Sequence, residues 1–247
     1  MKDLKPKIVV IMPAYNAEKT LRLSYHDIPK GMADTIILTD DASTDKTVEI
    51  ARELGLKVFQ HTRNKGYGAN QKTCYAEALK DDPDVIVMLH PDYQYDPTLL
   101  PAIVQPIIEG RADVVLGSRI LGGDVLRRGM PVWKYIPNRI LTLLENRALR
   151  WNLSEYHTGY RAYTGDVLRK ISFMKNSDKF LFDSEILFQI KEKGFRVKEV
   201  PAPIRYFKES RSASFSHSVA YGFGVLLLLL KYKLYQLGLI KSALFDS

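Results

Sequence analysis

Apolar residues are concentrated in short runs along the first half of the chain. Segments with such runs lie at residues 7–16, 34–43, 56–61, 84–89 and 112–119, and the run in the first segment is unbroken up to its proline. Continuous apolar runs of this length, without alternation of polar residues, are typical of strands that are buried on both faces of a parallel sheet. We therefore expect a strand in each of the five segments.

Segments with apolar residues at helical spacing separate these runs. They cover residues 17–28, 44–55, 64–82 and 98–110. In the second of them, Thr44 is the expected N-cap and Gly55 the expected stop. Alternation of strands and helices predicts an α/β fold with a mostly parallel sheet flanked by helices. Binding sites in such sheets lie at the carboxyl ends of the strands.

The pattern changes after residue 120. A basic segment with several glycines leads to an expected helix at 138–151, a segment without a clear assignment at 158–171, a helix at 182–194, a short strand at 196–204 and an apolar C-terminal region. This order predicts one domain over residues 1–215, with halves at about 1–119 and 120–215, and a C-terminal apolar or amphipathic helical segment at 216–247.

Positive charge is concentrated in one quarter of the chain. The formal net charge is +8, and residues 111–170 carry eleven Lys or Arg against five Asp or Glu. Such a patch predicts an anionic partner, which could be phosphate groups, nucleic acid or an acidic membrane surface; ordinary solvated helix faces are the plain alternative. Nothing at the N-terminus resembles a signal peptide, and the single cysteine, Cys74, excludes an internal disulfide framework and fits a reducing compartment.

Residues with distinctive chemistry or conformation follow four of the expected strands. They are Pro13, Ala14, Tyr15 and Asn16 after the first, Asp40, Asp41 and Asp45 after the second, Gly66 and Gly68 after the third, and His90, Asp92 and Gln94 after the fourth. Asp41 can accept the ring N–H of a uracil or a guanine, whereas Asp40 and Asp45 are also typical turn and cap residues. The glycines permit close backbone approach to a ligand.

Seven short motifs occur in a fixed order on this background: "PAYN", "DDASTD", "NKGYGA", "HPDYQYDP", "GSR", "TGYRAY" and "GFRVKEVP". Together they resemble the GT-A inverting glycosyltransferases, specifically the large family that includes the dolichyl- and polyprenyl-phosphate sugar synthases. The resemblance covers residues 7–215. It implies a Rossmann-like GT-A fold, in which residues 1–119 bind a nucleoside diphosphate sugar, residues 120–215 bind the acceptor, and a divalent cation (Mn²⁺ or Mg²⁺) bridges the pyrophosphate.

The resemblance also implies roles for individual residues. The nucleotide-binding residues would be Pro13, Ala14, Tyr15, Asn16, Asp41, Gly66 and Gly68, and Asp92 and Gln94 would lie at the metal. His90 departs from the family pattern, which begins this motif with aspartate. Imidazole binds Mn²⁺ or softer ions but is a poor ligand for Mg²⁺. We expect Asp92 to hold the metal, with His90 as a ligand or a hydrogen-bond donor to phosphate; the alternative is that His90 only caps the strand.

The acceptor decides which other catalytic groups are needed. A sugar hydroxyl needs a carboxylate base, whereas a phosphate monoester is already largely ionised at neutral pH and needs cations to hold it. The polyprenyl-phosphate enzymes that the chain resembles gather cations around phosphates at the positions of Arg119, Arg127, Arg128 and Arg161. Glu155 stands where these enzymes have aspartate and is a candidate base or structural ligand, with Asp183 and Glu185 as alternative carboxylates. The expected catalytic residues are Asp92, Arg119, Arg128, Glu155 and Asp183, and the expected acceptor-phosphate ligands are Arg127, Arg128 and Arg161.

The C-terminal region carries twelve residues without charge, at 219–230. This length is short of the ~20 residues that a helix needs to cross a bilayer. The following lysines and tyrosines, including Lys231 and Lys233, suit an interfacial helix and interrupt a longer span. The pattern favours peripheral membrane attachment or helix-mediated association, including a homo-oligomer; a helix that covers the core is the alternative.

The sequence therefore predicts a metal-dependent inverting glycosyltransferase at the cytoplasmic face of a membrane. It would move a hexose from a UDP- or GDP-sugar to a polyprenyl phosphate, dolichyl or undecaprenyl, in glycan or cell-wall biosynthesis. Transfer to a hydroxyl of a glycan or glycolipid is the alternative reaction, and a non-catalytic nucleotide-sugar binding protein is the alternative of another class. Nucleic acid is not an expected partner, because the chain has no nucleic-acid-binding motif.

Overall fold

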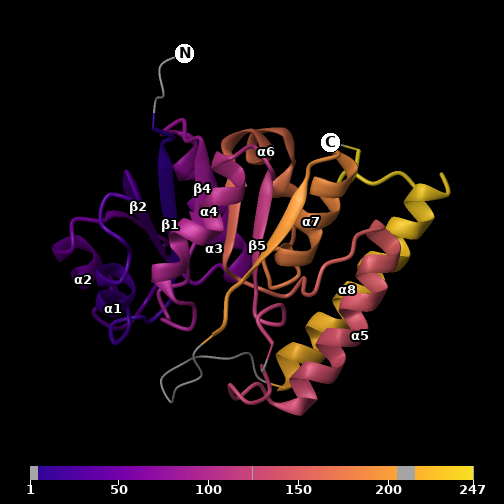
Figure 1. Ribbon diagram of the computed structural model, residues 1–247, viewed down its shortest axis with the longest axis horizontal. Coiled ribbons are helices and arrows are strands. Elements are labelled where there is room, and N and C mark those ends of the chain that lie inside the picture. Colours follow the sequence, from indigo (N-terminus) through magenta and orange to yellow (C-terminus); the bar gives the residue numbers. More distant parts are fainter. Residues whose placement is uncertain (1–4, 124, 205–214, 247) are drawn as a thin grey trace.

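A central seven-stranded sheet organises the molecule, and helices pack against it (Figure 1). The computed structural model describes residues 5–123, 125–204 and 215–246. The strands are β1 (Ile8–Ala14), β2 (Thr35–Asp40), β3 (Lys57–Gln60), β4 (Val85–Met88), β5 (Val114–Ser118), β6 (Arg161–Thr164) and β7 (Val197–Pro201). The helices are α1 (Leu21–His26), α2 (Thr47–Glu53), α3 (Tyr67–Leu79), α4 (Leu100–Ile108), α5 (Val132–Leu149), α6 (Gly165–Lys170), α7 (Phe182–Glu192) and α8 (Phe215–Gln236), with short 3₁₀ turns at Pro97–Leu99 and Phe173–Lys175.

The strand order is β3-β2-β1-β4-β6-β5-β7. Strand β6 runs antiparallel to both of its neighbours, and every other pair in the sheet is parallel. The five strands predicted in the first half are confirmed, and so is the predicted strand at 196–204, which is β7. Strand β6 was not predicted, because its four residues, "RAYT", contain no apolar run that would mark them as a strand.

Two apolar cores lie on opposite faces of the sheet. Successive residues of β1 alternate between them: Val9 and Ile11 belong to the core that includes α3, α6 and α7, whereas Ile8, Val10 and Met12 belong to the core that includes α1, α2 and α4. All seven residues of β1 are buried. A strand covered on both faces explains why its sequence is continuously apolar.

The predicted starts of α2 and α5 differ from the structure. The N-cap position of α2 is Lys46, so the prediction of Thr44 as N-cap is wrong; the backbone N–H of Thr44 donates instead to Asn16 Oδ1 at 2.8 Å. Helix α5 begins at Val132, six residues before the predicted start at 138, although Pro137 lies inside it. Gly55 is confirmed as a stop signal, since it follows α2 with a left-handed φ of 72°.

Helices α5 and α8 pack along one another at the edge of the molecule that is furthest from β1 (Figure 1). Val225, Leu228 and Tyr232 of α8 are buried, whereas Phe223 and Leu227 are about two-thirds exposed. By length and composition alone, Ser218–Gln236 is long and apolar enough to cross a membrane. Its packing shows that α8 also covers the core, which was the alternative expectation for this segment.

Candidate active site

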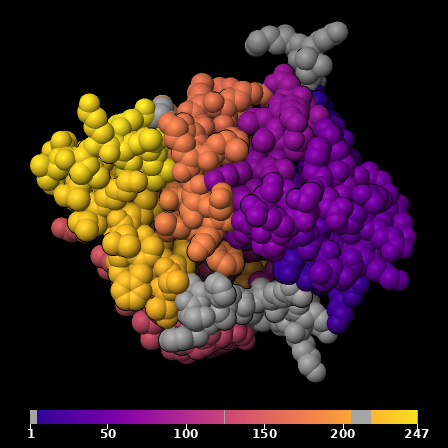
Figure 2. Space-filling model, turned by 180° about the vertical axis from the view of Figure 1, so that it is seen from behind, coloured from indigo at the N-terminus to yellow at the C-terminus, as the bar shows by residue number. Residues whose placement is uncertain are grey.

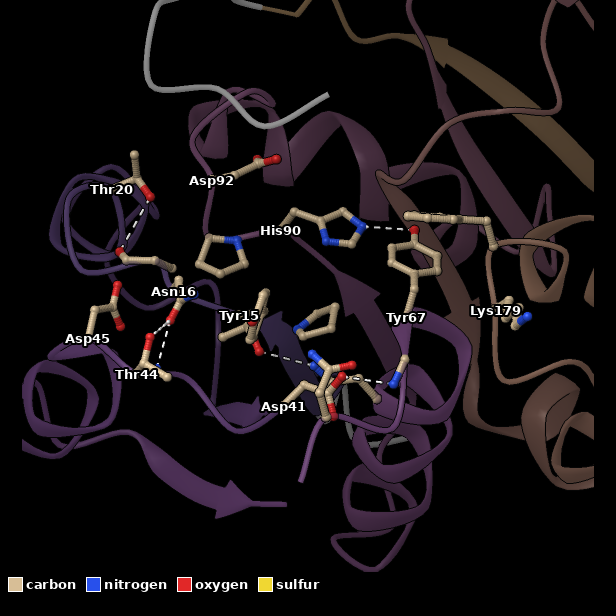
Figure 3. Close-up of a pocket in the computed structure, with 18 of the residues that line it drawn as sticks. Tyr15, Asn16, Thr20, Asp41, Thr44, Asp45, Tyr67, His90, Asp92 and Lys179 are labelled. Carbon is tan, nitrogen blue, oxygen red and sulfur yellow. Dashed lines mark hydrogen bonds between the residues drawn. The ribbon is translucent and has the colours of Figure 1, made fainter. Parts of the chain in front are cut away.

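A cleft of about 1470 Å³ opens at the carboxyl ends of β1, β2 and β4 (Figure 3). Its walls come from residues after these strands, from the start of α3, from the segment before α7 and from α8. Of the predicted site residues, the cleft brings together Pro13, Ala14, Tyr15, Asn16, Asp41, Gly66, His90 and Asp92. Asp41 and Asp92 therefore line one cavity, although they follow different strands, β2 and β4.

Asp41 is held rigidly at the wall of the cleft. Its side chain is almost completely buried, and its Oδ1 accepts hydrogen bonds from the Lys65 N–H at 2.8 Å and from His61 Nδ1 at 2.7 Å. Its Oδ2 accepts from the Gly66 N–H at 2.9 Å. A carboxylate has about four acceptor positions, so Oδ2 retains the capacity to accept one more hydrogen bond from a ligand in the cleft.

The segment after β1 is fixed by Asn16. This residue has a left-handed φ of 51°, its N–H donates to Ser43 Oγ at 2.7 Å, and its Oδ1 accepts from the Thr44 N–H. Asn16 therefore ties the ends of β1 and β2 together. The neighbouring Tyr15 lines the cleft with 45% of its surface exposed. An aromatic ring in this position can stack on a nucleobase.

His90 is held by Tyr67 rather than by Asp92. Its ring stacks on that of Tyr67 with centroids 5.6 Å apart, and its Nε2 lies 3.2 Å from the Tyr67 hydroxyl. Figure 3 shows the His90 ring directed toward Tyr67, whereas the Asp92 carboxylate points in another direction. A Cβ on Gly159 would come within 2.7 Å of the His90 ring, so glycine at that position leaves room for the imidazole. Ligation of a metal by His90 stays a prediction.

Asp92 offers a single carboxylate to the cleft. Its Oδ1 accepts the Gln94 N–H at 3.1 Å, and burial raises the pKa of Asp92 while the neighbouring His90 opposes that rise. Among the residues that the structure describes, no three His, Cys, Asp or Glu side chains are grouped as a metal cage. Mg²⁺ in phosphate-handling sites is commonly held by one or two carboxylates together with substrate phosphates. The donor set at Asp92 fits a cation of that kind, which the substrate helps to bind.

Gly66 and Gly68, the two glycines of "NKGYGA", allow the backbone of residues 177–179 to pack closely against the start of α3. A Cβ on Gly68 would overlap the carbonyl oxygen of Ser177, and one on Gly66 would come within 2.7 Å of the Asp178 carbonyl oxygen. The Gly68 N–H donates to that Asp178 oxygen at 2.8 Å. Gly68 is not among the described residues that line the cleft, and its contacts seat the segment before α7 against α3. An approach of Gly68 to the ligand stays a prediction.

The buried Glu155 pairs with the partly buried Arg119 outside the cleft lining. The Glu155 side chain is completely buried and accepts hydrogen bonds from the Arg119 backbone N–H, the Arg119 guanidinium and Asn138 Nδ2, the first and last at 2.9 Å. A carboxylate with this many partners acts as a structural ligand, which was one of the two roles expected for it. It orients Arg119 after β5.

Arg161 does not reach the cleft. Its guanidinium is completely buried and donates to the backbone oxygens of Thr158, Tyr156 and Asp183 at 2.7–2.9 Å. The prediction that Arg161 binds acceptor phosphate is therefore wrong, because three carbonyls occupy its donors. Asp183 lies beside it and accepts from the Tyr67 hydroxyl at 2.8 Å and from Gln71 Nε2 at 3.0 Å, so it stands behind Tyr67 rather than in the cleft.

The remaining predicted residues lie outside the described lining of the cleft. Arg127 and Arg128 are exposed in the segment between β5 and α5, and Gln94 follows Asp92 without lining the cavity. Their expected roles stay predictions. The cleft also contains residues that sequence reasoning did not single out, including Tyr67, Lys179, Phe180 and Tyr221. Tyr67 sits between the two glycines of a motif that was noticed, but the others carry no sequence signal that marks a site.

A buried polar group, which we call the α5–α8 polar cluster, joins Tyr221 to the domain. The Tyr221 hydroxyl lies 2.8 Å from both His157 Nδ1 and Ser184 Oγ, and His157 Nε2 lies 3.2 Å from Glu145 Oε2. Burial raises the pKa of Glu145 to about 8 and lowers that of His157 to about 4. Both groups are therefore mainly uncharged at pH 7, and the Tyr221 hydroxyl connects α8 to α7 and to the segment before β6 without a buried ion pair.

The fold and the cleft together define an α/β protein whose candidate ligand site lies at the carboxyl ends of its parallel strands. Residues 9–172 match the family described as Glycosyl transferase family 2, and the chain belongs to this family. Its fold is the GT-A fold, and the protein is a glycosyltransferase.

Named relatives extend this comparison. The chain is 30% identical over 231 residues to an uncharacterized protein of Methanocaldococcus jannaschii, covering 94% of each chain. It is 27% identical to the UDP-N-acetylglucosamine–dolichyl-phosphate N-acetylglucosaminyltransferase of Methanococcus voltae, covering 91% of this chain and 96% of the relative. Glucosyl-3-phosphoglycerate synthase of Mycobacterium tuberculosis, crystallised with Mn²⁺, UDP-glucose and phosphoglyceric acid, shares the fold with a TM-score of 0.71 at 20% identity, over 96% of this chain and 82% of that one.

Proposed function

We propose that this glycosyltransferase moves a sugar, with inversion, from a nucleoside diphosphate sugar to a polyprenyl phosphate at the cytoplasmic surface of a membrane, and that a divalent cation assists. One observation carries the proposal. A single cavity runs from Asp41 and Asp92 at the strand ends to Ala220 and Gly224 on α8. It offers polar groups for an activated sugar at one end and a helix with an apolar outer surface at the other.

The strand-end wall suits the donor. Tyr15 would stack on the base, and the remaining acceptor position of Asp41 Oδ2 would take a ring N–H from the base. Uridine is the preferred nucleoside of this proposal, because UDP or a UDP-sugar appears in the names of the Methanococcus voltae relative and the Mycobacterium tuberculosis structure. Buried, rigid hydrogen bonds to Asp41 preorganise this contact, since the carboxylate does not have to move when the base binds.

Asp92 would hold the divalent cation together with phosphate oxygens of the donor. A bound cation of this kind stabilises the negative charge that collects on the departing diphosphate. Asp92 is partly desolvated, which strengthens its attraction for a cation. Tyr67, whose hydroxyl donates to Asp183, fixes the His90 ring beside this position and limits the space open to water.

The acceptor half favours a phosphate over a hydroxyl. A hydroxyl acceptor needs a carboxylate base within reach, yet none of the three candidate bases is among the described residues that line the cleft. Glu155 is saturated by Arg119 and Asn138, Asp183 accepts from Tyr67 and Gln71, and Glu185 accepts the Ser177 N–H. A polyprenyl phosphate attacks as an anion and needs no such base.

Helices α5 and α8 would attach the enzyme to the membrane surface. Each leaves an apolar stripe exposed, with Trp133, Ile136, Ile140 and Leu143 on α5 and Phe223, Leu227 and Leu230 on α8. Lys134, Arg139, Lys231 and Lys233 lie on the same helices and suit anionic headgroups. Because other side chains of α8 are buried against the domain, we propose peripheral attachment rather than a complete span.

The proposal is tested with purified protein, undecaprenyl phosphate in vesicles, and a panel of UDP-glucose, UDP-N-acetylglucosamine, UDP-galactose and GDP-mannose. We expect mass spectrometry to detect a lipid-linked sugar from one UDP-sugar with Mn²⁺ or Mg²⁺, and no product with a chelator. Asp92→Asn should abolish transfer, whereas the matched change Asp82→Asn, at an exposed position away from the cleft, should not. Product formed only on a prenyl alcohol or a glycan hydroxyl would contradict the acceptor, and donor binding without any turnover would contradict catalysis.

A further inference from the structure

The end of the cleft furthest from the strand ends is built from two segments that are distant in sequence. Lys179, Phe180 and Leu181 precede α7, and Ala220 and Gly224 lie one helical turn apart on α8. Figure 2 shows residues of the α6–α7 region, in orange, lying between the N-terminal part of the chain and α8, in yellow. Both segments are thus in a position to contact a molecule that enters from the side of α8.

The α8 side of this end is small and apolar. Gly224 carries no side chain, and a Cβ there would come within 3.3 Å of Leu181 Cδ1, which is tighter than ordinary packing. Ala220 is exposed. Phe180 is 39% exposed, and its ring centroid lies 4.6 Å from that of Tyr67. Apolar surface left accessible inside a cleft is a recognition feature, because it gains free energy when a ligand excludes water from it.

Lys179 supplies the charge at this end. It is exposed and lines the cleft beside Phe180. Figure 3 shows it beyond Tyr67, on the opposite side from Asp92. An ammonium group binds phosphate as a point charge. Lys179 is therefore adjacent in the chain to Phe180 and Leu181 and lines the same cavity as Ala220 and Gly224, which matches a ligand whose phosphate is attached directly to a hydrocarbon.

The α5–α8 polar cluster keeps this wall in place. Tyr221 lies between the two small residues, and its hydroxyl is fixed by His157 and Ser184 at 2.8 Å each. Phe223 and Leu227, on the same helix, are 64% and 66% exposed. A hydrocarbon chain that leaves the cleft along α8 would meet this exposed apolar surface next.

We propose that Lys179, Phe180, Leu181, Ala220 and Gly224 form the acceptor subsite, in which the Lys179 ammonium binds the phosphate of a polyprenyl phosphate and the apolar wall contacts its first isoprene units. This assignment rests on the proposed function and makes it specific. It replaces Arg161, which is buried, as the source of positive charge for the acceptor, and it places the lipid on the α8 side of the cleft.

Two matched pairs of variants test the subsite with undecaprenyl phosphate as acceptor. Lys179→Glu should raise the acceptor KM about tenfold or more, since a charge-assisted contact is replaced by repulsion; Lys175→Glu, at an exposed position outside the cleft lining, should leave it unchanged. Ala220→Trp should fill the wall and raise the same KM, whereas Val219→Trp, on the neighbouring exposed position, should not. The donor KM should stay the same in all four variants, and a UDP-induced thermal shift verifies that each is folded.

The outcomes distinguish failure of the subsite assignment from failure of the proposed function. If wild-type protein transfers sugar to undecaprenyl phosphate but Ala220→Trp behaves like Val219→Trp, the apolar wall is not the lipid subsite. If Lys179→Glu raises the donor KM and spares the acceptor KM, Lys179 binds the diphosphate instead and the assignment is overturned. Geranyl phosphate consists of only the first two isoprene units, so Ala220→Trp should raise its KM as well; a loss seen only with undecaprenyl phosphate would place the contact further along the lipid. Failure of wild-type protein to use any prenyl phosphate would refute the proposed function itself.

Discussion

Replacing Glu145 by glutamine tests the electrostatics of the α5–α8 polar cluster. The carboxyl group is completely buried 3.2 Å from His157, and burial raises its pKa from 4.5 to about 8. The folded protein therefore keeps this proton between pH 4.5 and 8, whereas the unfolded chain releases it. Since the folded state binds more protons in this range, the free energy of unfolding falls as the pH rises.

His157 has the opposite effect over a lower range. Burial lowers its pKa from 6.5 to about 4, so the unfolded chain binds the extra proton between pH 4 and 6.5, and the free energy of unfolding rises with pH there. The two slopes largely cancel below pH 6.5. From pH 6.5 to 8 only the Glu145 slope remains, and at about 1.4 kcal/mol per pH unit it lowers the stability by about 2 kcal/mol.

The assay is urea unfolding at several pH values between 6.5 and 8. We expect the wild-type protein to lose about 2 kcal/mol over this range from Glu145, and Glu145→Gln to lack that part of the slope because glutamine does not titrate. Glu49→Gln, at an exposed position in α2, is the matched control and should keep the wild-type slope. Equal slopes in Glu145→Gln and wild-type protein would show that Glu145 does not hold a proton in the fold, and would refute the uncharged cluster.

Three further changes probe other parts of the structure. Tyr67→Phe removes a hydroxyl that donates to a buried carboxylate and should lower the unfolding free energy by about 1–3 kcal/mol, measured by denaturant titration. Gly68→Ala should cost about 1–3 kcal/mol because its Cβ overlaps a carbonyl oxygen, whereas Gly222→Ala, with its nearest neighbour at 3.8 Å, should be neutral or raise the Tm. Leu227→Glu should reduce co-sedimentation with anionic vesicles, and Leu23→Glu, on α1, should not; equal retention of both variants would exclude α8 as the attachment surface.

The sequence was sufficient to predict the parallel core of the sheet, because β1, β4 and β5 are buried at every position and their sequences are therefore largely apolar. Strand β3 is an edge strand with exposed ends, and it was predicted from a weaker pattern. Strand β6 has no such apolar run, because its four residues begin with Arg161 and end with Thr164. Its position between β4 and β5 depends on strand pairing rather than on composition. Helix α5 was predicted too short because local rules give Pro137 the weight of a helix boundary.

The donor side of the cleft could be predicted because its residues follow strands directly, as Asp41 and Asp92 do. The acceptor side could not, since it is assembled from a loop before α7 and a helix near the C-terminus. Positive charge was also misleading there. Arg161 belongs to the basic segment 111–170, yet three backbone carbonyls hold it in the interior. A sequence shows that an arginine is present, but not whether its partners come from the protein or from a ligand.

The insertion of β6 between β4 and β5 has a consequence for synthesis on the ribosome. One side of β4 pairs with β1 early, but its other neighbour is made only when the chain reaches Arg161. During that interval β4 presents an unpaired apolar edge, which is the kind of surface that other nascent chains and chaperones recognise. We therefore expect cleavage of the chain between α5 and β6 to yield aggregating fragments rather than two soluble halves.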